Sequence, residues 1–160
     1  NRFFTKDTTM ANHLPEQIAS LLIPMVGRPL LLPNVAVAEI VPWQEPVKLE
    51  GKPYWVLGEV EWRGIKVPVI SLELMNDPEL EDAYQGNRLA VLNGVGQTDK
   101  PFYALSVQGI PRLVRVFPDE VGNEQDATEE KSYAMHVQVS GERVVIPDLV
   151  AVEKELDAVL

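Results

Sequence analysis

The sequence predicts a mainly β protein made of two small β-barrels packed on each other, and three observations support that prediction. Short runs rich in Val, Ile and Trp alternate with turns that contain Gly or Pro, which is typical of strands joined by hairpins. One pattern, an apolar run, Gly, a basic residue with Pro and a second apolar run, occurs at 20–32 and again at 90–105. Helical character is clearest in the last segment, 147–160. Two similar halves made of hairpins therefore indicate a duplicated barrel.

We place these halves, which we expect to be intertwined, at about 18–74 and 88–150. A half of that size has a marginal core, so we expect the two to fold together as one domain. The sequence does not begin with Met, which makes Met10 a candidate start and the residues before it a cloning remnant within a tail at 1–17. The apolar run 18–26 is far shorter than the roughly 20 residues that cross a bilayer, and we expect it to be a buried strand.

The clearest element is a hairpin in residues 53–73 (PYWVLGEVEWRGIKVPVISLE), whose strands meet at Arg63 and Gly64. A loop of these two residues alone puts apolar residues on one face, because side chains alternate along a strand. The pairs expected on that face are Trp62 with Ile65, Val60 with Val67, and Gly58 with Val69, and those on the other are Glu61 with Lys66 and Leu57 with Ile70. A three-residue loop would set Lys66 against Val60, so the pattern favours the first register and an exposed Arg63.

The other elements are predicted from apolar runs and from the Gly, Pro and polar residues that separate them. After a turn at 27–29 we expect a strand at 30–32, a helical turn at 33–41 with Val37 and Ile40 on its inner face, and an irregular loop at 42–53. Beyond the hairpin we expect a loop or a short helix after Asp77 and Pro78, strands at 88–95, 102–107 and 110–117, a solvated acidic loop at 118–132, and a last hairpin formed by 133–139 and 144–146. The C-terminal helix begins with Asp148 as its N-cap, and Leu149, Val152, Leu156 and Val159 form its apolar stripe, which we expect in the core.

Composition excludes several function classes. The chain has 160 residues, 46% apolar and 24% charged, which are globular values. Its net charge of −10 argues against a nucleic-acid surface and against an anionic membrane surface. It has no Cys, so neither disulfides nor thiolate chemistry are possible.

No reactive constellation is evident in the sequence. Ser106, His136 and Asp148 could be drawn as a triad, but no nucleophile-elbow motif accompanies them. Glu59 and Glu61 fit a solvated strand face, and the acidic residues at 77, 79 and 81 lack the Gly and the final Glu of a calcium loop. We therefore predict no catalytic, metal or cofactor site. Trp43, Trp55 and Trp62 gather near Arg63, which indicates either barrel core or a binding surface rich in hot-spot residue types.

The segment 53–73 resembles the signature of CheW-like chemotaxis coupling domains: a strand, a Gly, a short polar run, an Arg-Gly turn, then V-P-V and a second strand. VAVAEIV at 35–41 is similar to the family's V-x-E-I segment. VLNGVGQTDKPFYALSVQGIPRLVRV at 91–116 resembles its second hairpin, and VVIPDLVAVEKEL at 144–156 resembles its closing strand and helix. The resemblance extends from about Ile18 to Leu156.

This resemblance implies two five-stranded SH3-like barrels and a non-enzymatic adaptor, without cofactors, that couples chemoreceptors to a CheA-type histidine kinase in cytoplasmic arrays. Receptor tips would bind a hydrophobic groove between the barrels, and the kinase regulatory domain would pack barrel against barrel, with no nucleic acid and no direct membrane insertion. The positions that match the family's contact regions, together with Trp62 from the hot-spot argument, are Val37, Glu39, Gly58, Trp62, Arg63, Val107, Ile110 and Leu113.

Departures from the family pattern indicate a divergent member. Ser71 and Gln108 stand where the family often has Asp, and the two tryptophans around the hairpin are unusual. The chain in these respects resembles the ChpC type of a type IV pilus (twitching) chemosensory system, where a core coupling role and an accessory role both remain open. The alternative is a β-barrel regulator that binds a small ligand or a cyclic nucleotide between its halves.

Overall fold

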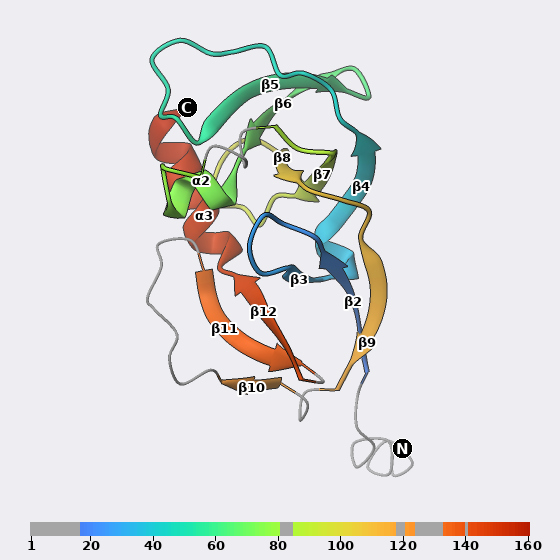
Figure 1. The fold of residues 1–160 in the computed structure, drawn as a ribbon. Helices are drawn as coiled ribbons and strands as arrows, with labels where there is room; N and C mark the ends of the chain where they lie inside the picture. The colour runs from blue at the N-terminus through green and yellow to red at the C-terminus, as the bar shows by residue number, and fades with distance from the viewer. Residues whose placement is uncertain (1–16, 81–84, 118–120, 124–132, 140) are drawn as a thin grey trace.

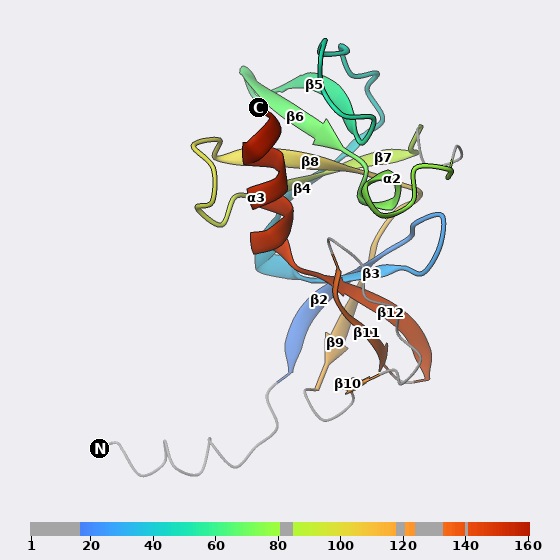
Figure 2. The same ribbon diagram turned by 90° about the vertical axis from the view of Figure 1, so that its left-hand side faces the viewer.

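The computed structural model describes residues 17–80, 85–117, 121–123, 133–139 and 141–160. Its strands form two sheets, one above the other in Figure 2, with the C-terminal helix α3 running along the side of the upper one. The upper sheet has five strands in the order β4-β7-β8-β6-β5, and the lower has six in the order β10-β11-β12-β3-β2-β9. A mainly β fold of two small sheet units with a C-terminal helix is therefore confirmed.

The bounds of the elements are as follows (Figure 1). The five-stranded sheet consists of β4 (Val37–Pro42), β5 (Val56–Trp62), β6 (Ile65–Ile70), β7 (Arg88–Asn93) and β8 (Phe102–Val107). The six-stranded sheet consists of β2 (Ile18–Ile23), β3 (Leu30–Pro33), β9 (Arg112–Val116), β10 (Val121–Asn123), β11 (Tyr133–Val139) and β12 (Glu142–Pro147). The helical elements are the 3-10 turn η1 (Asn34–Ala36) and the helices α2 (Leu72–Asn76) and α3 (Leu149–Val159).

The sheets do not divide the chain into the halves expected at 18–74 and 88–150. Strands β2 and β3 join four strands from the C-terminal part, while β7 and β8 complete the other sheet. Four pairings cause this exchange: β12 with β3 and β6 with β8 are parallel, and β2 with β9 and β4 with β7 are antiparallel. Sequence similarity between hairpins identifies the strands but not their partners. The short β10 also gives one sheet a sixth strand, inside the segment expected to be a solvated loop.

The central hairpin has the predicted loop and most of the predicted register. Arg63 and Gly64 have φ angles of 50° and 79°, as in a type I′ turn. The pairs Trp62–Ile65, Val60–Val67, Gly58–Val69 and Glu61–Lys66 are confirmed. The predicted pair of Leu57 with Ile70 is wrong: a bulge follows Val56, which pairs with Ile70 instead. Gly58, with φ of 142°, permits this bulge because it has no Cβ.

One helical prediction needs correction, and another lies largely outside the described residues. The segment 33–41 forms only the turn η1 before it continues as strand β4, because pairing with β7 satisfies its backbone groups. A bulge after Val37 still brings Val37 and Ile40 to one face, opposite Leu92 and Ala90. The loop or short helix expected after Asp77 and Pro78 falls largely on residues 81–84, which lie outside the described residues. A helix that was not expected, α2, precedes Asp77 and Pro78. Its N-cap is Ser71, whose Oγ accepts from the Leu74 N–H at 3.1 Å.

The core explains why the sheets form one unit. Alternate residues of β2, β3 and β12 point to opposite sides, as the period of a strand requires. Leu22, Leu31 and Val144 belong to the small core within the six-stranded sheet. Their neighbours Ile23, Leu30 and Val145 belong to the large core shared with the five-stranded sheet and α3. The predicted stripe of α3 enters this large core, with Val152 and Leu156 buried, and Asp148 caps the helix through the Ala151 N–H at 3.0 Å.

Candidate functional site

The candidate site is a group of four side chains at the Arg63 turn, which we call the hairpin cluster: Glu39, Trp62, Arg63 and Phe102. Glu39 Oε1 accepts from Trp62 Nε1 at 2.9 Å and from Arg63 Nη2 at 3.2 Å. The Arg63 guanidinium lies over the Trp62 ring, 4.9 Å from its centroid. The Trp62 ring in turn meets Phe102 edge-on, with centroids 4.8 Å apart. One carboxylate and one indole thus fix the position of the guanidinium.

The hairpin cluster also closes the five-stranded sheet. Its edge strands are β4 and β5, which lie at opposite ends of the strand order. Glu39 belongs to β4 and Trp62 to β5, so their hydrogen bond joins the two edges. The sheet must curl for these edges to meet, which is the geometry of a small barrel. The predicted contact residues are therefore held by the barrel itself.

The hairpin cluster remains open to solvent on its charged side. The side chains of Arg63 and Glu39 are 69% and 41% exposed. An ion pair this exposed contributes about 0–1 kcal/mol to folding, so it orients Arg63 more than it stabilises the protein. Among the described residues only Nη2 contacts Glu39, which leaves the other N–H donors of the guanidinium available to a partner.

The structure thus brings together three of the eight predicted contact residues, Glu39, Trp62 and Arg63. The other five lie elsewhere. Val37 is partly buried against the large core. Gly58 is buried beneath the 42–53 loop, where its role is one of backbone geometry. Val107 is wrong as a surface contact, because β8 is the central strand of its sheet and this side chain is fully buried. Ile110 and Leu113 are 70% and 57% exposed, in the link to β9 and in β9 itself.

The three tryptophans that the sequence places near Arg63 also lie in different surroundings. Trp55 is buried in the large core, and Trp43 packs against that core while its Nε1 donates to Glu45 at 3.4 Å. Only Trp62 belongs to the hairpin cluster. The core interpretation therefore holds for Trp55, while Trp43 and Trp62 are both half-buried against the large core.

Two buried carboxylates were missed from the sequence. Glu153 is fully buried in α3 and accepts from the backbone N–H groups of Val95 at 2.5 Å and Gln97 at 3.1 Å. It thereby fixes the loop between β7 and β8. Its position was detectable, because it follows Leu149 by four residues and precedes Leu156 by three, which places it on the buried stripe. Burial raises the pKa of the nearby Tyr103 hydroxyl, and the Glu153 charge raises it further.

Glu73 is the second buried carboxylate, and it likewise fixes a loop by accepting hydrogen bonds from backbone N–H groups. It lies buried in α2, and its carboxylate accepts from the backbone N–H groups of Val26 and Gly27 in the β2–β3 loop. Desolvation raises the pKa of Glu73 above its ordinary value of 4.5, although these hydrogen bonds partly offset the rise. No sequence signal identified it, since its partners are almost fifty residues away and belong to the other sheet.

The raised pKa of Glu73 predicts a pH dependence of stability. Between pH 4.5 and the raised pKa, the folded state binds more protons than the unfolded chain. The free energy of unfolding contributed by this group therefore falls as pH rises through that window. We expect Glu73→Gln to abolish this fall in urea titrations between pH 4 and 7, whereas Glu79→Gln, at an exposed position, should retain it. Parallel curves for the wild type and Glu73→Gln would contradict the prediction.

The structure offers no support for a catalytic triad. Ser106 lies in β8 and His136 in β11, which belong to different sheets. Asp148 is engaged as the cap of α3. No group of potential metal ligands occurs within the described part of the chain. No helix among the described residues is long and apolar enough to cross a membrane.

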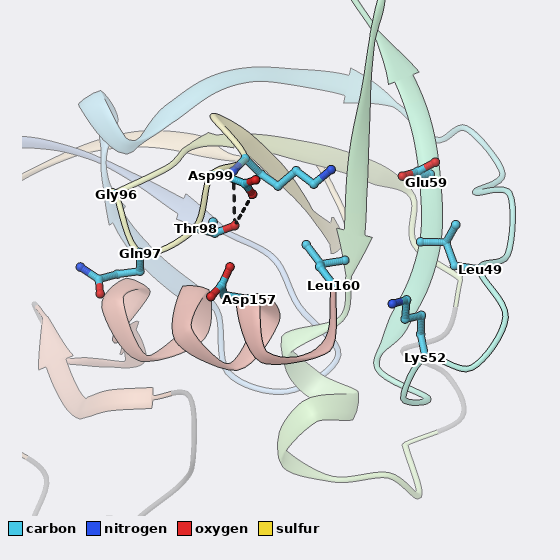
Figure 3. A pocket seen from close by; sticks show the side chains of 10 residues that line it. Leu49, Lys52, Glu59, Gly96, Gln97, Thr98, Asp99, Asp157 and Leu160 are labelled. Carbon is cyan, nitrogen blue, oxygen red and sulfur yellow. Dashed lines mark hydrogen bonds between the residues drawn. The ribbon is translucent and has the colours of Figure 1, made fainter.

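The hollow in Figure 3 has a volume of about 820 Å³ and lies between the β7–β8 loop, the end of α3 and the loop before β5. Its lining mixes cations such as Lys52 and Lys100 with Glu59, Asp99 and Asp157. Thr98 and Asp99 hydrogen-bond to each other at 3.5 Å, and both belong to the β7–β8 loop. This hollow lies beside the five-stranded sheet, not between the halves where the ligand-binding alternative expected a pocket.

A curled β-sheet whose two edges are joined by the Glu39–Trp62 hydrogen bond, with Arg63 exposed beside it, defines the class: a small β-barrel module. The chain belongs to the CheW-like domain family, whose sequence profile matches residues 20–156. Its fold is similar to that of the scaffolding protein TtCheW from Thermoanaerobacter tengcongensis, with a TM-score of 0.69 and 15% identity over 84% of this chain and 90% of that one. A search of curated protein sequences gave no match. CheW-like proteins are non-enzymatic scaffolds of chemotaxis signalling.

Proposed function

We propose that this protein is a cytoplasmic adaptor that couples chemoreceptors to a CheA-type histidine kinase, and that the hairpin cluster is one of its contact surfaces. Family membership supports the adaptor role. The single observation that supports the site is the triple contact among Glu39, Trp62 and Arg63, which holds an exposed guanidinium in one position.

Such an arrangement suits binding for an energetic reason. Arg and Trp dominate interface hot spots, and a side chain that is already ordered loses little entropy when a partner binds. The type I′ turn, the cation–π contact and the Glu39 carboxylate together pre-order Arg63. Ile110 and Leu113 add exposed apolar area on the other sheet, in the region expected to line the receptor groove.

The finer assignment, a divergent ChpC-type member of a twitching chemosensory system, is part of the same proposal. It rests on Ser71 and Gln108 and on the paired tryptophans of the hairpin region. The structure gives Ser71 a local role as the cap of α2. Asp is equally suited to capping, so this departure leaves the fold of α2 intact.

The test is binding of the purified protein to a receptor cytoplasmic tip and to a kinase regulatory domain from its own cell. We expect Arg63→Glu to weaken at least one of these interactions at least tenfold, in line with about 2 kcal/mol for a hot-spot residue. Lys154→Glu is the matched control, with the same charge change at an exposed position of α3. Unchanged affinity for both partners in Arg63→Glu, with an intact near-UV spectrum, would remove the hairpin cluster from the contact surface.

A further inference from the structure

We propose a second docking surface on this protein, a pocket beside α2 that receives a short partner segment with an apolar anchor and acidic side chains on one side of it. The pocket, which we call the loop pocket, has a volume of about 560 Å³ and lies between the 42–53 loop and α2. It is lined by Lys48, Leu49, Lys52, Pro53, Tyr54, Val56, Leu57, Leu74 and Pro78. This inference is independent of the hairpin cluster.

The loop pocket is formed before any partner arrives. The backbone of Val47 exchanges two hydrogen bonds with Glu59 of β5, of 2.8 and 2.9 Å. The Val56 N–H donates to the Pro53 carbonyl at 3.0 Å, which closes a turn. Trp55 anchors the end of the loop in the core. Because the 42–53 loop is held at these points, it loses little conformational entropy when a partner binds, and pre-organisation of this kind favours affinity.

The interior of the loop pocket is apolar and its rim is aromatic. Val56, Leu57 and Leu74 are buried residues whose surfaces form part of the lining. Tyr54 on the rim is 52% exposed, although its ring is large and apolar. The volume is within the range of pockets that hold ligands, roughly 300–1,000 Å³. A preformed apolar hollow with an exposed aromatic rim is the usual receptor for an apolar anchor side chain.

Charge specifies the partner. Among the described residues, the charged side chains that line the loop pocket are those of Lys48 and Lys52, although the chain as a whole carries a net charge of −10. Lys52 is held in place, since its Nζ donates to the Val159 carbonyl at 2.6 Å. At the other end, Asp77 and Glu79 flank Pro78. A partner must therefore present carboxylates only on the lysine side of its anchor, because a uniform polyanion or an anionic membrane would also meet the two acidic residues.

The test uses the full chain labelled with ¹⁵N and blocked pentapeptides as probes. Leu-Phe-Gly-Glu-Glu and its reversed sequence supply an apolar anchor with acids on one side, and Leu-Phe-Gly-Lys-Lys is the charge-reversed counterpart. We expect an acidic probe, up to millimolar concentration, to shift the amide resonances of Leu49, Tyr54 and Leu74, and the basic probe to bind more weakly. No shift with any probe, or equal shifts with acidic and basic probes, would overturn the proposal.

Three single substitutions test whether the probes bind at the loop pocket. Lys48 is exposed, so Lys48→Glu should fold normally and raise the Kd of the acidic probe about three- to fivefold, as expected for reversing one exposed pair. Tyr54→Ala should weaken both probes by removing the rim. Arg63→Glu is the control, because it makes the same kind of charge change on the hairpin cluster and should leave probe binding unchanged. Equal loss in Lys48→Glu and Arg63→Glu would overturn the proposal, whatever the outcome for the adaptor function.

Discussion

Replacing Gly58 by Ala is expected to lower the free energy of unfolding by about 3–5 kcal/mol, the largest effect we predict for a single methyl group. A Cβ at this position would lie 2.4 Å from the Val47 carbonyl oxygen and 2.8 Å from its carbon. Both atoms are backbone, held by the hydrogen bonds to Glu59, and cannot move aside. The φ of 142° adds strain. Strain and overpacking each cost about 1–3 kcal/mol, and urea unfolding measures their sum.

Gly64→Ala is the matched control for that experiment. Gly64 also has a positive φ, 79°, but no atom lies within 4 Å of its hypothetical Cβ. We expect a loss of about 1 kcal/mol, from backbone conformation alone. Equal losses at both positions would show that the contact with Val47 is unimportant. The pair also bears on function: lost partner binding in Gly58→Ala would follow from a displaced 42–53 loop, since Gly58 itself is buried.

Replacing Glu153 by Ala is expected to cost about 2–4 kcal/mol of stability. The change removes the acceptor of two backbone N–H groups, those of Val95 and Gln97, and leaves a cavity in α3's buried face. A hydrogen bond to a charged group contributes about 1.5–3 kcal/mol, and a buried group without a partner adds its own penalty. Urea unfolding gives the total, and faster hydrogen exchange at the two amides would assign it to the β7–β8 loop.

Two further variants make this prediction specific. Glu153→Gln keeps the shape but sets an NH₂ donor against one of the two N–H donors, so an intermediate loss is expected. Asp157→Asn changes an exposed carboxylate on the same helix and should stay within about 0.5 kcal/mol of the wild type. If Glu153→Gln is as stable as the wild type and protects both amides equally, the carboxylate is not what holds the loop.

Local patterns in the sequence correctly predicted those features that depend only on residues near each other in the chain. The type I′ turn at Arg63 and Gly64 follows from the few residues that tolerate positive φ, and the register beside it follows from alternation. The cap at Asp148 and the buried stripe of α3 follow from spacing along one helix. The predicted register was wrong at Leu57 because the strand has a bulge there, beside the place where the Val47 backbone packs against Gly58. The alternation of residues along one strand carries no signal for such a contact with a loop.

The candidate site was only partly predictable for the same reason. Exposure of Arg63 could be expected from its place in a tight turn. Its contact with Glu39 could not, because those residues lie on opposite edges of a sheet that must first curl. Val107 was assigned to the groove from its match to the family's contact region, and position in a family pattern does not show which face of β8 a side chain occupies; the structure buries it completely.

The sequence by itself determined the local elements: most of the strands, the central hairpin, the final helix and the absence of thiol chemistry in a chain without Cys. Only the tertiary structure decided which strands pair, because the parallel pairings of β3 with β12 and of β6 with β8 join segments far apart in the chain. It also decided that the Glu73 carboxylate is buried, since the N–H groups of Val26 and Gly27 that bind it lie almost fifty residues away in the chain. Long-range packing, unlike turn chemistry, has no local signature.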